Sequence, residues 1–178
     1  AGKATISGSL DRMIKKEKIT AADKESAMAN LTTVTDFAAL SDVDIVIEAA
    51  TENEPLKLKI FEELDAICKP GAILASNTSS ISLTRIAGAT RRAEQVSGMH
   101  CMNPVPMMEL VEVIRALQTS DETYQCVHDL SVAIGKVPIE ANDSPGFVGN
   151  RILIPMINEA VFTLHEGLAD AEGIDTIM

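Results

Sequence analysis

The sequence has 178 residues, of which 46% are hydrophobic and 23% are charged. This balance is typical of a globular protein with one domain, or with one domain and part of a second. The formal net charge of −11 argues against nucleic acid or an anionic membrane as a partner, because both recruit basic surfaces. Cys68, Cys101 and Cys126 form no metal-ligand spacing, and their odd number favours a reducing, cytoplasmic compartment. No apolar run approaches the length of a membrane span.

The chain order predicts two helices followed by an alternation of strands and helices. Apolar residues at helical spacing predict a helix over 3–18, and Thr20 with Asp23 resembles the capping box of a second helix that runs to Asn30. The expected strands are then 31–35, 42–50, 72–76, 95–100, 110–115 and 137–141, with a helical turn at 36–40 and helices at 54–68, 82–89 and 121–134. This alternation indicates an α/β fold with a mostly parallel sheet.

The pattern changes after the segment NDSPGF. From Val148 to Glu166 it predicts one long helix that is rich in aliphatic residues and contains Pro155. We therefore predict a domain junction at 142–147. Residues 1–141 then form the α/β domain, and residues 142–178 form the junction and the first long helix of a helical domain.

Polar clusters follow three of the expected strands. EAATENEPLK follows the strand at 42–48, SNTSS follows 72–76, and HCMNP follows 95–99. In an open parallel sheet, ligands bind outside the C-terminal ends of the strands. Three clusters at one edge therefore predict a binding site there.

His100 and Glu112 are the candidate acid–base residues. A lone histidine is more often a satisfied core residue, and a glutamate in an alternating strand more often faces solvent. Asn103, Pro104 and Pro106 fix a rigid path just after His100, which suits a positioned proton-transfer group. If Glu112 points inward, a hydrogen bond to His100 would satisfy both groups and fix the imidazole tautomer.

Other polar residues have ordinary interpretations from the sequence alone. Ser79 fits a turn-forming hydroxyl, and Asn150 fits a capping residue of the long helix. Lys57 and Glu52 fit a solvated ion pair. These interpretations stand beside functional ones for the same residues.

Four segments together resemble the 3-hydroxyacyl-CoA dehydrogenase family in order and spacing. They are VIEAATENEPLKLKIF, ASNTSSIS, GMHCMNPVPMMELVEVI and DSPGFVGNRILIPMINEA, and they are closest to short-chain bacterial 3-hydroxybutyryl-CoA members. The resemblance implies an NAD- or NADP-dependent enzyme with a Rossmann domain, here residues 1–141, and an all-helical domain that forms homodimers or larger oligomers. It implies interconversion of (S)-3-hydroxybutyryl-CoA and acetoacetyl-CoA, in fatty-acid and butyrate metabolism, without a metal.

The resemblance also assigns roles to residues. His100 matches the catalytic base and Glu112 the carboxylate that orients it, while Ser79 and Asn150 match the hydroxyl and amide that contact the 3-oxygen and the thioester region. The positions that match the lining of the nicotinamide and its ribose are Glu52, Lys57, Ser79 and Asn103. The positions near the family's CoA-phosphate lysines are Arg12 and Lys16.

The sequence departs from the family pattern in several places. Cys101, Glu109 and Gly149 stand where an aromatic residue, a lysine and a valine are usual. No GxGxxG motif is present, so we expect a Rossmann-like sheet without its first βαβ segment, in a chain truncated at both ends and inactive by itself. Two alternatives remain open: a non-catalytic CoA-binding or structural relative, and a longer-chain or multifunctional dehydrogenase.

Overall fold

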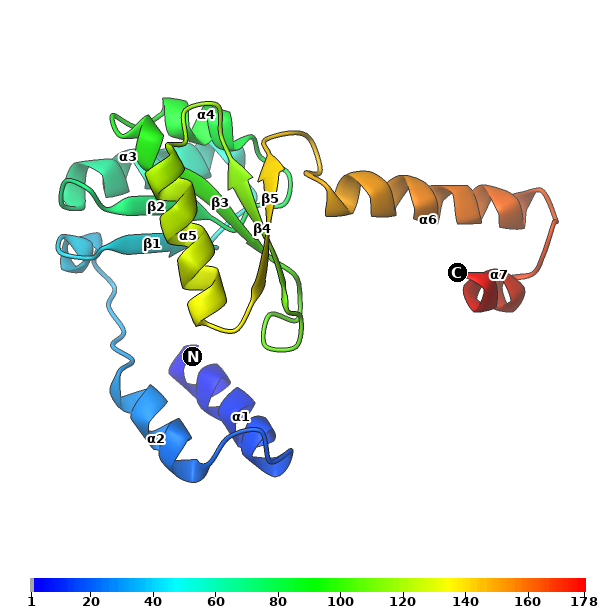
Figure 1. Cartoon of the computed structure of the whole chain (residues 1–178), viewed down its shortest axis with the longest axis horizontal. Helices are drawn as coiled ribbons and strands as arrows, with labels where there is room; N and C mark the ends of the chain where they lie inside the picture. Colours follow the sequence, from blue (N-terminus) through cyan, green and yellow to red (C-terminus); the bar gives the residue numbers. More distant parts are fainter. Residues whose placement is uncertain (1) are drawn as a thin grey trace. The chain divides into compact units, whose positions relative to one another are not determined.

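The computed structural model describes residues 2–178 and divides into two compact units, one ending at Ala39 and one spanning Leu40–Met178. The first unit contains α1 (Gly2–Lys15) and α2 (Ala21–Ala29) (Figure 1). The Thr20 hydroxyl accepts a hydrogen bond from the Asp23 backbone at 3.1 Å, and the Asp23 carboxylate accepts one from the Thr20 backbone at 2.8 Å. The predicted capping box is therefore present at the start of α2.

The strand predicted at 31–35 is wrong. This segment is irregular and largely exposed, and no strand in the described part of the chain pairs with it. Its β-branched residues favour an extended backbone, but a strand also needs a neighbour for its N–H and C=O groups. The helical turn predicted at 36–40 is present as the short helix η1 (Phe37–Leu40).

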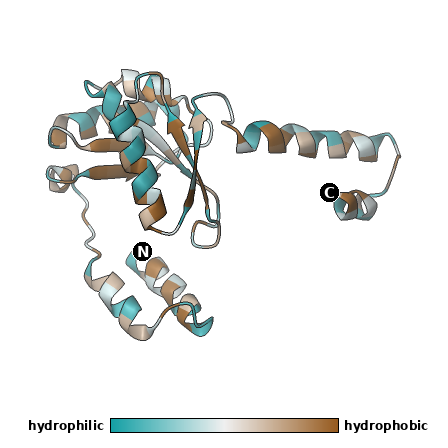
Figure 2. Ribbon diagram, in the orientation of Figure 1, coloured by the Kyte–Doolittle hydropathy of each residue, from teal (hydrophilic) through white to brown (hydrophobic). Residues whose placement is uncertain are grey.

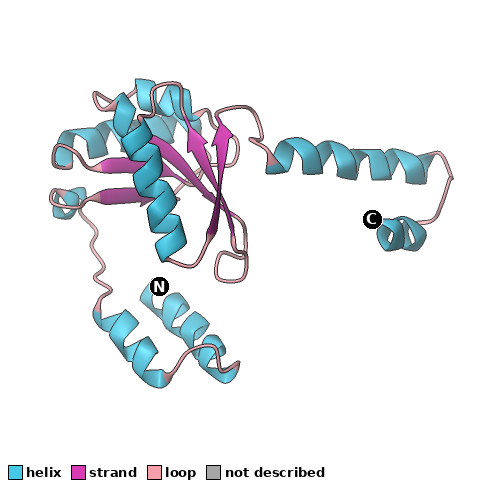
Figure 3. Ribbon diagram, viewed as in Figure 1, coloured by secondary structure: helices cyan, strands magenta, loops and turns pink. Residues whose placement is uncertain are grey.

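The second unit is built on a five-stranded sheet in the order β1-β2-β3-β4-β5 (Figure 3). The strands are β1 (Ile45–Glu48), β2 (Ile73–Ser76), β3 (Val96–Cys101), β4 (Leu110–Arg115) and β5 (Val137–Asn142). Only the β3–β4 pair is antiparallel, and the other three pairs are parallel. The prediction of a mostly parallel, Rossmann-like α/β sheet is confirmed.

Helices cover both faces of this sheet, with α3 (Glu54–Ile67) and α4 (Leu83–Gly88) on one side and α5 (Asp121–Ala133) on the other (Figure 1). Alternate side chains of a strand point to opposite faces, so each strand contributes to two cores. One core joins Phe61 and Leu64 of α3 to Leu74 and Ile114. The second joins Val127 of α5 to Ile73, Ala75, Met99, Val111 and Val113. The apolar strands between the helices stand out in Figure 2.

The strand expected at 42–50 is shorter and less buried than predicted. It is reduced to β1, and the side chain of Ile47 is 46% exposed. The reason is its position, because among residues 2–178 β1 pairs with a strand on one side only. β2 lies between β1 and β3, and it is buried along its whole length as predicted.

Short polar signals set the helix ends. Asn53 accepts from the backbone of Leu56 at 3.0 Å and begins α3, with Pro55 in the first turn as predicted. The remaining elements are η2 (Ala93–Gln95), α6 (Gly149–His165) and α7 (Ala171–Ile177). Among residues 2–178, no helix is long and apolar enough to cross a membrane.

Candidate active site

Two of the predicted polar clusters form the wall of one cavity. β1, β2 and β3 run parallel, so their C-terminal ends meet at the same edge of the sheet. The loops after β1 and β2 enclose a cavity of about 320 Å³ there. Its lining consists of Ala49, Ala50, Thr51, Glu52, Lys57, Asn77, Thr78 and Ser79. The third cluster reaches this edge through His100, near the end of β3.

His100 and Glu112 lie directly opposite each other on the antiparallel strands β3 and β4. Directly opposed residues of such a pair place their side chains on the same face. The Nδ1 atom of His100 is 2.7 Å from Oε2 of Glu112, and the two residues are only 4% and 2% exposed. The sequence left the direction of Glu112 open, and the structure shows that it points inward.

The donors around Glu112 determine the tautomer of His100. Its Oε1 accepts backbone N–H groups from Val148 at 3.0 Å and Gly149 at 2.8 Å. An ionised carboxylate has no proton to donate, so with Glu112 ionised we assign the proton of the neutral His100 ring to Nδ1. Nε2 of the neutral ring then has its lone pair free, and it accepts from the Ser79 hydroxyl at 2.9 Å. The result is an ordered chain of hydrogen bonds from Glu112 through His100 to Ser79.

Glu52 fixes the loop that carries Ser79. Its Oε1 accepts from the Ser79 backbone at 2.8 Å, and its Oε2 accepts from the Thr78 hydroxyl at 2.7 Å. The solvated pair of Glu52 with Lys57 expected from the sequence is therefore wrong. Each of the two binds a different partner, because Lys57 is buried and Glu52 is exposed.

Lys57 is almost fully buried and forms an ion pair with Glu48 at the end of β1. The Ser76 hydroxyl donates to the same carboxylate at 2.9 Å, and the Ala50 backbone donates to its other oxygen at 2.7 Å. Burial by itself raises the pKa of Glu48, but the hydrogen bonds from Lys57, Ala50 and Ser76 outweigh it and lower this pKa.

Sequence reasoning missed Glu48 and Ser76, although a signal existed. Lys57 stands four and seven residues before Phe61 and Leu64, both buried, so the helical period places it on the core face of α3. A lysine there requires an acidic partner. Glu48, at the end of an apolar strand, was the natural candidate.

Phe147 is a third residue that sequence reasoning missed. It is 3% exposed, and its ring meets the imidazole of His100 edge-on, with centroids 5.5 Å apart at 61°. Gly146 and Phe147 have positive φ angles of 77° and 47°, which turn the chain back toward the sheet before α6. The PGF tripeptide is the signal for this turn.

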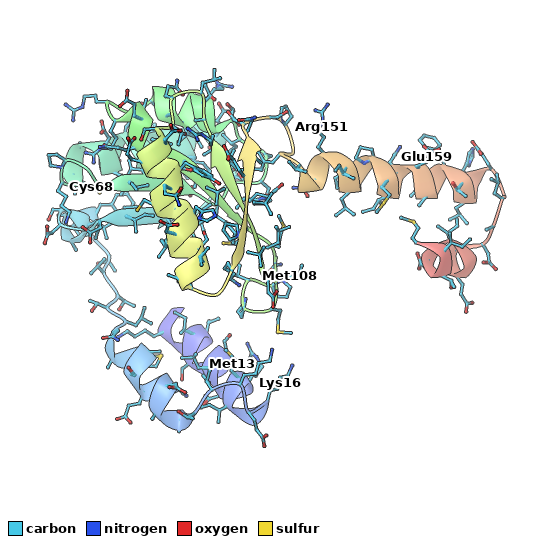
Figure 4. The ribbon with its side chains drawn as sticks, in the orientation of Figure 1. Met13, Lys16, Cys68, Met108, Arg151 and Glu159 are labelled. Carbon is cyan, nitrogen blue, oxygen red and sulfur yellow. The ribbon has the colours of Figure 1, made fainter. Side chains whose placement is uncertain are left out.

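Among the described residues, the remaining predicted site residues are not part of the hydrogen-bonded chain from Glu112 through His100 to Ser79. Asn150 is partly exposed in the first turn of α6, and Asn103 is exposed and does not line the cavity. Arg12 and Lys16 are exposed in the first unit, near the C-terminal end of α1, where Figure 4 labels Lys16. Their predicted contacts with substrate and cofactor remain predictions.

Comparison with known proteins agrees with this α/β fold. Residues 1–144 match the sequence model of the 3-hydroxyacyl-CoA dehydrogenase NAD binding domain, and residues 146–178 match the model of the C-terminal domain of 3-hydroxyacyl-CoA dehydrogenase. The chain therefore belongs to the 3-hydroxyacyl-CoA dehydrogenase family, as the resemblance of its motifs implied.

Individual relatives refine the comparison. The chain is 48% identical to 3-hydroxybutyryl-CoA dehydrogenase of Bradyrhizobium diazoefficiens, covering 100% of this chain and 61% of the relative. It is 41% identical to human mitochondrial hydroxyacyl-coenzyme A dehydrogenase, covering 99% and 58%. The crystal structure of (S)-3-hydroxybutyryl-CoA dehydrogenase from Ralstonia eutropha superposes with a TM-score of 0.93 at 57% identity, covering 96% and 60%. The chain thus spans 58% to 61% of the length of these relatives.

Proposed function

We propose that the whole protein is an NAD(P)-dependent oxidoreductase that interconverts (S)-3-hydroxybutyryl-CoA, or related 3-hydroxyacyl-CoA, and the matching 3-oxoacyl-CoA such as acetoacetyl-CoA. One observation carries this proposal. The chain of hydrogen bonds from Glu112 through His100 ends at Ser79, which lines the polar cavity. A buried imidazole with its free nitrogen turned toward such a cavity is arranged to exchange a proton with a bound hydroxyl group.

The cavity fits the nicotinamide end of the cofactor. Its lining combines carboxylate, ammonium, amide and hydroxyl groups, which suit the carboxamide and ribose hydroxyls of that group. Glu52, Lys57 and Ser79 would hold it, together with Asn103 from the loop after β3. When bound, the nicotinamide supplies the hydride chemistry, and the protein supplies alignment.

The roles of the side chains follow from the tautomer. Nε2 of His100 accepts the proton of the C3 hydroxyl during oxidation and returns it to the 3-oxygen during reduction. Glu112 stabilises the imidazolium that oxidation creates. The Ser79 hydroxyl, 2.9 Å from Nε2, hydrogen-bonds the same 3-oxygen, and the Asn150 amide contacts the thioester region.

We also propose how the protein binds CoA, where it is located and how it assembles. Arg12 and Lys16 would meet the phosphates of CoA, because a local cationic face can bind an anionic group on a protein with a net charge of −11. We infer a cytoplasmic enzyme of fatty-acid and butyrate metabolism that works as a homodimer or a larger homo-oligomer. Subcellular fractionation and sedimentation test the location and the assembly.

A steady-state assay tests the reaction. Purified whole protein is mixed with acetoacetyl-CoA and either NADH or NADPH, and the loss of the reduced cofactor is followed. NADH deuterated at C4 should transfer its deuterium to C3 of the product. His128→Gln, a change on a surface helix, serves as a control that keeps full turnover. A folded protein that binds acetoacetyl-CoA but transfers no deuterium with either cofactor would favour the non-catalytic alternative.

A further inference from the structure

We propose that the first turn of α6 positions the catalytic pair. The backbone N–H groups of Val148 and Gly149 hold one oxygen of Glu112, and this contact keeps the proton of His100 on Nδ1 and its Nε2 free. The inference rests on the proposed function for its catalytic meaning, but its geometry is independent of turnover. It assigns to the backbone at the start of α6 a part in proton transfer, separate from the substrate contact proposed for the Asn150 side chain.

The two oxygens of Glu112 have separate partners. Oε1 accepts from Val148 and Gly149, at 3.0 and 2.8 Å, while Oε2 accepts from His100 at 2.7 Å. The N–H groups at the start of a helix have no partner within the helix and favour negative charge. Glu112 therefore satisfies two of these donors, and in return its orientation is fixed from the α6 side.

The segment before α6 is anchored in a similar way. The Asp143 carboxylate accepts from the Ser82 hydroxyl at 2.7 Å and from the Thr84 backbone at 2.8 Å, at the start of α4. Phe147 then fills the space beside the His100 ring. Between these two anchors the chain turns through Gly146, which delivers the amides of the next residues to Glu112. The residues that hold the pair thus come from the boundary between the two matched family domains, residues 1–144 and 146–178.

The substitution Glu112→Gln reveals the influence of these amides on the tautomer of His100. The glutamine side chain has a carbonyl oxygen that accepts and an NH₂ group that donates, so its two orientations are not equivalent. The two N–H groups of Val148 and Gly149 favour the carbonyl end, which turns the NH₂ group toward Nδ1 of His100. Nδ1 must then accept, the ring proton moves to Nε2, and the nitrogen that faces Ser79 is no longer a base.

Nitrogen-15 NMR of the imidazole rings measures this tautomer directly. The chain has three histidines, so His128→Gln and His165→Gln identify the His100 signals. In the unaltered protein the neutral ring should carry its proton on Nδ1. In Glu112→Gln it should carry the proton on Nε2, with loss of the Nδ1–H signal. Retention of the Nδ1–H tautomer in a folded Glu112→Gln protein would overturn the proposal.

A backbone ester isolates the role of the amides. Glycolic acid in place of Gly149 removes a single N–H donor and puts an oxygen opposite the side chain of residue 112. Combined with Glu112→Gln, this ester should return part of the population to the Nδ1–H tautomer. The matched control replaces Ile152 with its α-hydroxy analogue. In the native chain the N–H of Ile152 donates to the Val148 carbonyl at 3.2 Å and not to residue 112, so this ester removes a helix hydrogen bond that does not involve residue 112. Equal effects of the two esters would contradict the proposal.

The same esters provide a test if Glu112→Gln does not fold. In the otherwise unaltered chain, the Gly149 ester should displace the Nδ1 proton resonance of His100, and the Ile152 ester should leave it in place. Equal displacement by both esters would show only a general loosening of the helix and would refute the positioning role. Because these readouts need no substrate, a protein without dehydrogenase activity could still confirm this inference, and an active one could still refute it.

Discussion

Two buried glutamates of the same sheet, Glu48 and Glu112, are held by the protein in the same way. In each, Oε1 accepts backbone N–H groups, one for Glu48 and two for Glu112. In each, Oε2 pairs with a basic side chain, which is Lys57 for Glu48 and His100 for Glu112. Both carboxylates are almost inaccessible, at 5% and 2% exposure. Both pairs therefore depend on partners within the protein to replace water.

The basic partners differ, and this difference separates structure from chemistry. The ammonium of Lys57 lies between Glu48 and Ser76, and it is a fixed charge that links α3 to β1 and β2. The imidazole of His100 uses one nitrogen for Glu112 and turns the other toward Ser79. The same arrangement of a carboxylate thus holds a charged ammonium in one place and orients an imidazole, the proposed proton acceptor, in the other. The two pairs should respond to substitution in opposite ways.

The largest effect is expected at His100. His100→Gln in the whole protein should lower turnover of acetoacetyl-CoA by roughly 10²–10⁴-fold, the usual range for losing a general acid–base group. Its glutamine amide can still donate to Glu112, so the free energy of unfolding should change much less. Steady-state kinetics and urea unfolding measure the two effects, with His128→Gln as the control. Near-normal turnover in the folded variant would contradict the assignment of His100 as the base.

Lys57→Met, unlike His100→Gln, should lower the free energy of unfolding strongly. It leaves Glu48 buried without its cation, which typically costs about 3–5 kcal/mol of unfolding free energy. Chemical denaturation measures the loss, and Lys59→Met, an exposed change on the same helix, is the matched control. A loss no larger than that of the control would mean that the Glu48–Lys57 pair does not support the fold.

The double variant Glu48→Gln with Lys57→Met tests the cause of that loss. Removing both charges avoids the isolated buried carboxylate, so stability should recover by a large part of the deficit. Losses that simply add would indicate that packing of the lysine chain, and not its charge, carries the effect.

Most of the fold could be predicted from the sequence because it is specified locally. The strand at 72–76 is a short run of apolar residues that ends at Ser76, and the helix at 54–68 begins with Asn53 and Pro55, which mark its start. The prediction was wrong at 31–35, where β-branched residues indicated a strand. Strand formation depends on a partner far away in the sequence, and no local pattern reveals whether that partner is in place.

For the candidate site, the sequence indicated which residues could exchange protons but not which atoms contact one another. His100 and Glu112 could be singled out by type and by the rigid loop between them, but their contact depends on the antiparallel register of β3 and β4. The orientation of Glu112 depends further on the amides of Val148 and Gly149, and backbone donors leave no mark in a sequence. The partner of Lys57 was missed for a different reason: the helical period places Lys57 on the core face of α3, but the contact of α3 with the end of β1, which brings Glu48 to it, forms only in the fold.

A smaller and opposite pair of effects is expected from two serines. Ser76→Ala removes a hydrogen bond of 2.9 Å to the Glu48 carboxylate and should cost about 1.5–3 kcal/mol of unfolding free energy, the usual worth of a hydrogen bond to a charged group. Ser79→Ala should leave stability nearly unchanged, because Ser79 is partly exposed, but should slow turnover. Unfolding curves and steady-state kinetics on both variants measure the two effects. A loss of stability in Ser79→Ala with unchanged turnover would contradict the assignment of Ser79 to the reaction.

The smallest predicted effect is on the free energy of unfolding at low pH. The pKa of Glu48 is lowered in the folded protein, since its hydrogen bonds from Lys57, Ala50 and Ser76 outweigh its burial. Its contribution to stability is therefore fully present above the unfolded value, about 4.3, and is lost as the pH falls through the folded pKa. Glu48→Gln cannot take up this proton.

Unfolding free energy measured at successive pH values below about 4.3 should consequently fall less steeply in Glu48→Gln than in the parent. One proton limits the difference in slope to about 1.4 kcal/mol per pH unit. Glu62→Gln, exposed on α3, reports the effect of one charge fewer without the buried pair. Parallel curves for the parent and Glu48→Gln would mean that the carboxylate of Glu48 binds its proton equally well in the folded and unfolded chains, and that the ion pair with Lys57 adds nothing to stability in acid.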